Sequence, residues 1–194
     1  MKKILIILFL FNIKYIYAHS IEADVFVQST VNRASLILSK NISKGEKINQ
    51  IKLIAKETVD IKGVGYYSLG SARKNLNDSQ KKQYFKSFEK YFLKSFSSRL
   101  SEYTNPKIEV VGKKVLNKNY TIVNSLLIGT SERPEVKIDW RVYTKNPDSP
   151  LIRDLIIEGL SLARTQKEEF SSILNSNNND IDILIKKLDE FANN

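Results

Sequence analysis

Two carboxylates near the end of the chain have the spacing of an acid–base pair. Asp154 lies inside the apolar, β-branched run Leu151–Ile157, and Glu158 follows it four residues later. Paired carboxylates are common agents of general acid–base catalysis. The run predicts a strand, in which positions 154 and 158 share one face while Leu155 and Ile157 lie on the other. We expect both carboxylates on the outer, solvated face, or paired with nearby basic side chains, rather than in a catalytic site.

The other residue types that carry chemistry lack partners. The only histidine is His19, and the chain has no cysteine. Disulfides, thiolate metal sites, a cysteine nucleophile and a bacterial lipoprotein anchor are therefore excluded. The serines and threonines have no histidine to activate them, and Gly63-x-Gly65 lacks the third glycine of a dinucleotide-binding loop. The sequence predicts neither an enzyme nor a metal or cofactor site.

The first 18 residues have the pattern of an export signal. A basic start, Met1–Lys3, precedes the apolar run Ile4–Ile13, and Ala18 ends the segment. This order predicts a secretory signal peptide cleaved after Ala18, and therefore an exported protein. The alternative is an uncleaved membrane anchor, which is less favoured because the run is too short to span about 30 Å and Lys14 interrupts it.

The rest of the chain has the composition of a globular protein. Of 194 residues, 42% are hydrophobic and 27% charged, so we expect a single domain over residues 19–194, with a core sufficient for a monomer. The net charge is +10, or +7 without the three lysines of the signal segment. Such a charge suits an anionic membrane surface, or it reflects a lysine-rich composition without a specific target. There is no dense basic run, and no nucleic-acid partner is expected.

Helical patterns come first along the chain. The strongest begins at a capping sequence, Asn77–Gln80, and has an aromatic stripe at three- and four-residue spacing. The stripe consists of Phe85, Phe88, Phe92, Phe96, Leu100 and Tyr103. The expected helices of this half cover Glu22–Leu38, Lys47–Lys56, Val59–Arg73 and Asp78–Tyr103.

Four strand patterns follow, and two further helices end the chain. Val136–Tyr143 alternates most clearly between apolar and polar residues, which predicts one buried and one wet face. The expected strands are Lys107–Leu116, Tyr120–Ile128, Val136–Tyr143 and Leu151–Ile157, and the expected final helices are Leu160–Leu174 and Ile181–Phe191. Short, turn-rich links indicate an antiparallel meander. The predicted class is α+β: a twisted four-stranded antiparallel sheet with helices packed over one face, the first of the two final helices folding back across the sheet.

An aromatic helix above an apolar sheet face either fills a core or encloses a dry pocket. Apolar ligands need little else, because each methylene removed from water contributes about 0.8 kcal/mol. Composition alone does not separate these alternatives. If there is a pocket, its expected lining is Leu69, Phe88, Phe92, Tyr103, Val123, Leu127, Val136, Ile138, Trp140, Val142, Leu155 and Ile157.

Several motifs together resemble the MlaC family, also called toluene-tolerance proteins. They are Leu69-Gly70, the helix start Asn77–Gln80, the aromatic helix from Phe85 to Tyr103, and the block Asp154–Ser161. Their order and spacing extend from about residue 59 to 188. The family's tryptophan at the last strand and glycine at the final helix are replaced here by Pro150-Leu151 and Asp180, positions outside the proposed pocket.

This resemblance implies a soluble periplasmic carrier of a phospholipid between the outer and inner membranes. It implies two docking partners: an inner-membrane ABC transporter with an MCE-domain protein, and an outer-membrane lipoprotein–porin complex. Bound phospholipid would be cargo rather than cofactor. Two other hypotheses remain: a non-catalytic envelope adaptor with a filled core, and a hydrolase on an α+β scaffold, which would need an acid–base pair inside the pocket.

Overall fold

The computed structural model describes residues 21–194, so the predicted signal peptide over residues 1–18 lies outside the described residues. The four predicted strands and all but one of the predicted helices are present, with ends that differ by a few residues. The helices are α1 (Ala23–Ser39), α2 (Lys44–Thr58), α3 (Ile61–Ser68), α4 (Asp78–Leu100), α5 (Leu162–Asn175) and α6 (Ile181–Asn193), and Ala72–Lys74 forms a short 3-10 turn, η1. The segment predicted as one helix over Val59–Arg73 is thus divided between α3 and η1.

The strands form one antiparallel sheet in the order β1-β2-β3-β4-β5, so the predicted α+β class and meander are confirmed. They are β1 (Ile108–Asn117), β2 (Tyr120–Leu127), β3 (Val136–Tyr143), β4 (Leu151–Ile157) and β5 (Leu160–Ser161). The sheet has one strand more than predicted. Glu158 and Gly159 both have positive φ, 49° and 82°, and make the tight two-residue turn that lets β5 pair with β4.

A β-bulge interrupts the regular alternation of β4. Val142 pairs with Ile152 and Arg141 pairs with Asp154, which leaves Arg153 as an extra residue. Ile152 and Leu155 are therefore both on the inner face, although they are three residues apart. Strict alternation would place Ile152 on the outer face, so the bulge changes which side chains the sheet presents inward.

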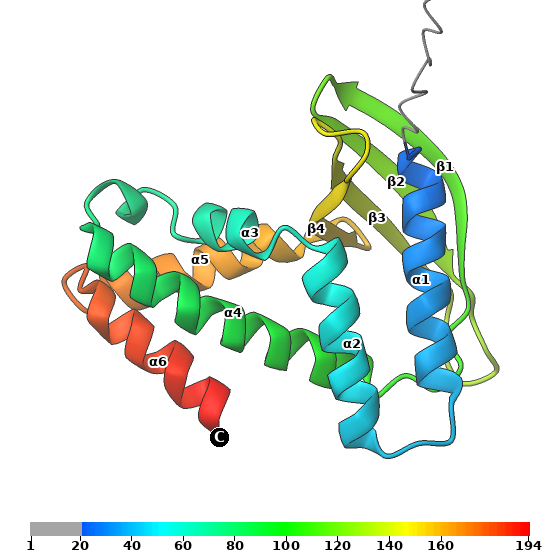
Figure 1. Cartoon of the computed structure of the whole chain (residues 1–194), viewed down its shortest axis with the longest axis horizontal. Coiled ribbons are helices and arrows are strands. Elements are labelled where there is room, and N and C mark those ends of the chain that lie inside the picture. Colours follow the sequence, from blue (N-terminus) through cyan, green and yellow to red (C-terminus); the bar gives the residue numbers. More distant parts are fainter. Residues whose placement is uncertain (1–20) are drawn as a thin grey trace, which may run out of the picture.

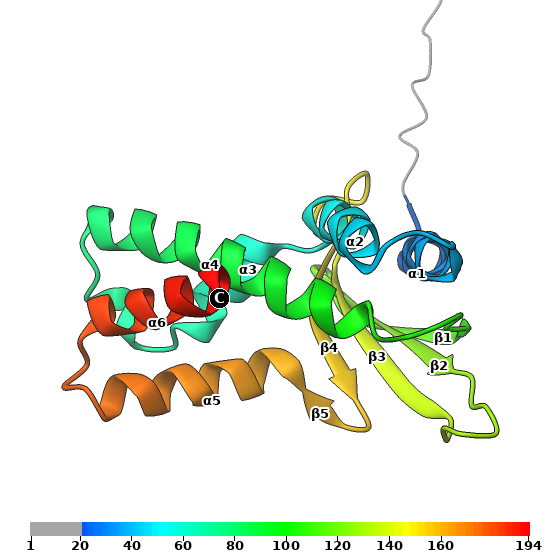
Figure 2. The same cartoon turned by 90° about the horizontal axis from the view of Figure 1, so that it is seen from below.

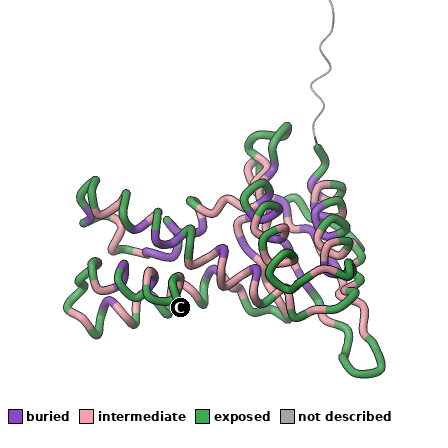
Figure 3. The backbone as a smooth tube through the Cα atoms, turned by 60° about the horizontal axis from the view of Figure 1, so that its bottom comes forward, coloured by how far each residue is buried: buried purple, intermediate pink, exposed green. Residues whose placement is uncertain are grey.

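Helices α1 and α2 cover one face of the sheet, as Figures 1 and 2 show from two directions. The buried side chains of α1, among them Val27 and Val31, pack against Val123 and Val142 of the sheet. Figure 3 shows that buried positions follow the facing sides of these helices and strands. This part of the structure is a layer of helices on a layer of strands, the architecture expected for its class.

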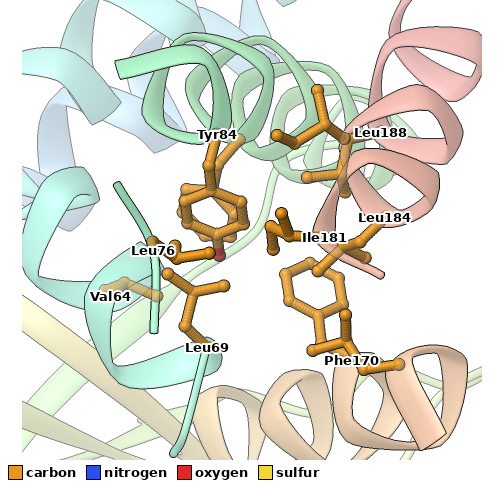
Figure 4. Close-up of a cluster of buried hydrophobic side chains, with 11 residues drawn as sticks. Val64, Leu69, Leu76, Tyr84, Phe170, Ile181, Leu184 and Leu188 are labelled. Atoms are coloured by element: carbon orange, nitrogen blue, oxygen red, sulfur yellow. The ribbon is translucent and has the colours of Figure 1, made fainter. Parts of the chain in front are cut away.

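The other helices form a second body beside the sheet. Side chains from α3, α4, α5 and α6 converge in one cluster, which Figure 4 shows around Tyr84 and Phe170. Helix α5 runs from the end of the sheet into this body (Figure 2), so the prediction that it folds back across the sheet is wrong. The apolar side chains of α5, among them Phe170 and Leu174, pack in the cluster with α4 and α6 instead.

Close contacts fix how α3 meets α4. Tyr84 is fully buried and its hydroxyl donates a 2.9 Å hydrogen bond to the carbonyl of Gly65. A Cβ on Gly65 would come within 2.7 Å of Cδ1 of Phe88, so only glycine permits this approach. The predicted capping box is present too: Asn77 Oδ1 accepts from the amide of Gln80, and Gln80 Oε1 accepts from the amide of Asn77. Helix α4 thus begins in the helical body and extends to the sheet.

Within residues 21–194, none of the helices combines the length and the hydropathy that crossing a membrane would require.

Candidate functional site

Two cavities adjoin each other where α4 reaches the sheet. The sheet-side cavity, about 160 Å³, lies between α1, α2, the end of α4 and the inner face of the sheet. The helix-side cavity, about 260 Å³, lies between α3, α4, α5 and β4. Seven residues line both: Val59, Phe96, Arg99, Trp140, Ile152, Leu155 and Leu162. The two cavities are therefore neighbouring compartments separated by a shared wall of mostly apolar side chains.

The sheet-side cavity is lined almost wholly by apolar groups. Its buried threonines satisfy their own hydroxyls, because Thr30 donates to the carbonyl of Phe26 and Thr58 to that of Ile54. These bonds within the helices leave little polar surface for the cavity. Arg99 is its only charged lining residue. Such a compartment suits hydrocarbon rather than a polar ligand.

Trp140 forms part of the wall between the two cavities. Its indole Nε1 donates a 2.8 Å hydrogen bond to Ser125 Oγ, and that hydroxyl donates onward to the carbonyl of Ile138. Ser125 lines neither cavity. Because its polar atom is satisfied within the sheet, the ring can present apolar surface to both compartments.

The helix-side cavity has a polar border between α4 and α5. Tyr91 donates a 2.8 Å hydrogen bond to Gln166 Oε1, and Gln166 Nε2 donates one of 2.9 Å to Glu169. Burial raises the pKa of Tyr91, and the charge of Glu169 raises it further, whereas the bond to Gln166 and the charge of Arg99 lower it. Arg99, Thr165 and Glu169 are the exposed residues of the lining. The cavity therefore reaches the surface at these three residues.

The prediction that Asp154 is solvated on the outer face is wrong. Its side chain is buried, because the start of α5 returns over it: Asp154 Oδ2 accepts from Ser161 Oγ at 2.7 Å and Oδ1 from the amide of Ala163 at 3.0 Å. Glu158 is exposed as predicted. Asp154 lines the helix-side cavity, but both of its oxygens are occupied in holding the first turn of α5.

Arg153, the bulged residue, joins the sheet to the α2–α3 connection. Its Nε donates to Asp60 Oδ2 at 2.7 Å, its Nη1 donates to the Tyr120 hydroxyl at 2.6 Å, and its guanidinium lies 3.7 Å from the ring centre of Tyr143. These hydrogen bonds keep the pKa of Arg153 above its usual value despite the opposing effect of burial. This guanidinium is fully engaged and holds the wall of the cavities in place.

The structure places eight of the twelve predicted lining residues at the cavities. Tyr103, Leu127, Ile138 and Ile157 line the sheet-side cavity, Phe88 and Phe92 the helix-side cavity, and Trp140 and Leu155 both.

The remaining four predicted residues line neither cavity. Val123 and Val142 share the inner face, but α1 covers them completely, and Val136 is half-buried beside the same cluster. Leu69 lies in the helical cluster instead. An inward-facing strand position borders a cavity only where no helix packs directly upon it.

Several lining residues escaped the sequence prediction. Ile152 was missed because the bulge in β4 was not recognised. Arg99 was missed because nothing in the sequence distinguishes it from an ordinary surface arginine. The apolar face of α2, including Ile51 and Ala55, lines the sheet-side cavity. The amphipathic pattern of that helix could have indicated its residues.

An open polar groove along α5, which includes Tyr67, Arg164 and Lys167, has no lining residue in common with the cavities. Among residues 21–194, there is no cluster of three or more histidine, cysteine, aspartate or glutamate side chains arranged to hold a metal ion.

Comparison with known proteins agrees with this architecture. A solved structure of the phospholipid-binding protein from Ralstonia solanacearum, in complex with a phospholipid, superposes with a TM-score of 0.73, at 18% identity, over 89% of this chain and 97% of that one. At this identity the likeness establishes the fold.

Sequence comparison gives the family. The intermembrane phospholipid transport system binding protein MlaC of Haemophilus influenzae is 26% identical over 137 residues, which are 69% of this chain and 63% of that protein. The chain thus aligns with somewhat less than two thirds of that relative's length. The family model described as MlaC protein matches residues 28–190. The resemblance noted in the sequence is confirmed, and the chain belongs to the MlaC family.

Proposed function

We propose that the protein is a non-enzymatic carrier that holds the acyl chains of a phospholipid in its two cavities. The observation that carries this proposal is the pair of adjoining, largely apolar compartments, which meet at the Trp140 wall and open beside Arg99. Two related proteins support the ligand class, since one is a binding protein of a phospholipid transport system and the other was solved with a phospholipid.

The free energy of burying hydrocarbon favours the acyl chains as the part of the phospholipid that the cavities bind. Each methylene moved from water into such a compartment contributes about 0.8 kcal/mol. The aliphatic and aromatic groups of the cavity walls supply this surface. The inner charged groups of the helix-side lining, Arg153 and Asp154, are bound to other protein groups. Binding by hydrocarbon burial also releases the ligand readily to another apolar site, because no directional bonds must be broken.

The cellular setting of this proposal comes from the family and from the N-terminal sequence. We place the protein in the periplasm, exported by a signal peptide over residues 1–18 that leaves a single domain. There it would carry phospholipid between the outer and inner membranes. Its partners would be an inner-membrane ABC transporter with an MCE-domain protein and an outer-membrane lipoprotein–porin complex.

The structure offers less support for the other two hypotheses. An adaptor with a filled core does not account for the two cavities. A hydrolase would need a free acid–base pair facing the ligand, whereas Asp154 is occupied by Ser161 and by the amide of Ala163. The polar chain from Tyr91 to Glu169 lies at the border, near the exposed lining residues.

The direct test is lipid capture. Native mass spectrometry of protein purified from cells should show co-purified phospholipid, and delipidated protein should take up phospholipid from vesicles. Failure of delipidated, folded protein to acquire any lipid would overturn the proposal.

A matched pair of serine variants ties the uptake to the cavity. Ser95 and Ser98 are both half-buried on α4, but only Ser95 lines the helix-side cavity. Ser95→Trp should block uptake while Ser98→Trp retains it. Equal uptake by the two folded variants would show that the ligand lies elsewhere.

A further inference from the structure

Arg99 holds a unique position in the site. It lines both cavities, is the only charged residue of the sheet-side lining, and is one of the three exposed residues of the helix-side lining. The two compartments therefore converge on the surface at this residue. A molecule with one apolar chain in each compartment would have its branching point here.

The guanidinium of Arg99 is available for a ligand. None of the ion pairs within residues 21–194 includes Arg99. Arg153, the other arginine at the helix-side cavity, is bound to Asp60 and Tyr120. Arginine presents a planar fork of donors that matches phosphate oxygens.

A carboxylate faces the same opening from the neighbouring helix. Glu169 on α5 is exposed, lines the helix-side cavity and accepts one hydrogen bond from Gln166, which in turn accepts from Tyr91 of α4. The opening thus has a positive group on α4 and a negative group on α5. This is the charge arrangement that complements a zwitterion and repels a second negative charge on the ligand.

We propose that Arg99 binds the phosphodiester of the lipid and that Glu169 selects a headgroup with a positive amine, so that the site prefers zwitterionic over anionic phospholipids. The inference rests on the proposed function and adds to it the headgroup class and the two residues that read it. The tails supply most of the affinity, and the charged pair supplies the discrimination between headgroups.

The test is a competition between lipids with identical tails. Delipidated protein is offered vesicles with equal amounts of dioleoyl phosphatidylethanolamine, dioleoyl phosphatidylglycerol and dioleoylglycerol, and the captured lipids are quantified by mass spectrometry. The wild type should take ethanolamine lipid over dioleoylglycerol by about tenfold, the discrimination expected of a hydrogen bond to a charged group.

Two variants remove one charge each. Arg99→Gln should bring the ratio of ethanolamine lipid to dioleoylglycerol close to one while uptake of dioleoylglycerol persists. Glu169→Gln should reduce the ratio of phosphatidylethanolamine to phosphatidylglycerol by about threefold, as expected for a partly screened charge. The persistence of dioleoylglycerol uptake shows that each variant is folded and retains its cavities.

Matched controls of the same residue types are available on α5. Arg164 and Glu168 are exposed residues of α5 that line only the open polar groove. Arg164→Gln and Glu168→Gln should leave both lipid ratios unchanged. If Arg99→Gln and Glu169→Gln behave like these controls, the headgroup assignment is wrong.

The possible failures are distinguishable. If the wild type captures none of the three lipids, the proposed function itself fails. If it captures them with ratios insensitive to Arg99, only the headgroup inference fails. Excess inorganic phosphate or glycerophosphoethanolamine should not compete, because neither has tails. Arg99-dependent competition by either would instead identify a site for a soluble phosphate compound and overturn the lipid assignment.

Discussion

The indole Nε1 of Trp140 donates a hydrogen bond to Ser125 Oγ, 2.8 Å away on the adjacent strand, and both side chains are buried. Ser125 also donates to the carbonyl of Ile138. One small hydroxyl therefore lets a tryptophan serve as an apolar wall, since it satisfies the one polar atom of the ring inside the sheet.

The first prediction concerns this bond. Ser125→Ala should lower the free energy of unfolding by about 1–3 kcal/mol, because the buried indole N–H loses its acceptor. In a Trp140→Phe background the same change should cost less, since no indole donor remains. Urea unfolding of the wild type, the two single variants and the double variant gives the coupling free energy between the two side chains. An equal cost of Ser125→Ala in both backgrounds would contradict the prediction.

The second prediction concerns the contact between α3 and α4. Gly65→Ala should destabilise the protein by about 1–3 kcal/mol, because the new methyl group meets the ring of Phe88. Gly45 in α2 is the control, as an added Cβ there has open space within 4 Å. Gly45→Ala should leave stability unchanged or raise it by up to about 1 kcal/mol. Thermal unfolding of both variants checks this, and similar effects would refute the steric argument.

The third prediction concerns the buried carboxylate of Asp154. Asp154→Ala should cost about 2–3 kcal/mol, because the Ser161 hydroxyl and the Ala163 amide both lose their acceptor. Asp154→Asn should cost less, since its amide oxygen still accepts from the Ala163 amide. Equilibrium urea unfolding measures both changes. A cost below about 0.5 kcal/mol for the alanine variant would show that the carboxylate does not hold α5.

The fourth prediction is a pH dependence at the start of α1. Lys113 Nζ donates to Glu22 at 2.6 Å and to Asp24 at 2.9 Å. The bond to Lys113 lowers the pKa of Asp24, and the bonds to Glu22 and Asp24 raise the pKa of Lys113. Because the folded pKa of Asp24 lies below its unfolded value, near 3.9, its contribution is present at neutral pH and is lost as the pH falls through the folded pKa.

The measurement is the difference in urea midpoint between the wild type and Lys113→Met. This difference should be positive near pH 6 and should shrink as the pH falls to about 3. The raised pKa of Lys113 implies that its own contribution persists until the pH rises above about 10. A difference that stays constant on acidification would show that the pair does not link protonation to folding.

Much of the fold follows from local pattern. The alternation of Val136–Tyr143 gave β3 its bounds and its inner face, and the capping residues Asn77 and Gln80 placed the start of α4 correctly. Such features are determined locally, because a two-residue period or a cap satisfies its own backbone regardless of distant packing. The order of the motifs that indicated the family is likewise a property of the sequence alone.

The cavities depended on information that no local pattern contains. Arg153, the extra residue of the bulge in β4, binds Asp60, 93 residues away, and the bulge turns Ile152 inward. Asp154 is buried only because α5 returns over it.

By itself the sequence determined most of the helices, the strands β1 to β4, the inner face of β3 and the absence of cysteine chemistry. Only the tertiary structure decided that the interior is two compartments with a shared wall at Trp140 and an opening at Arg99. The physical reason is that periodicity shows which side of an element is apolar, whereas the packing of distant elements decides whether that side meets another side chain or an open space.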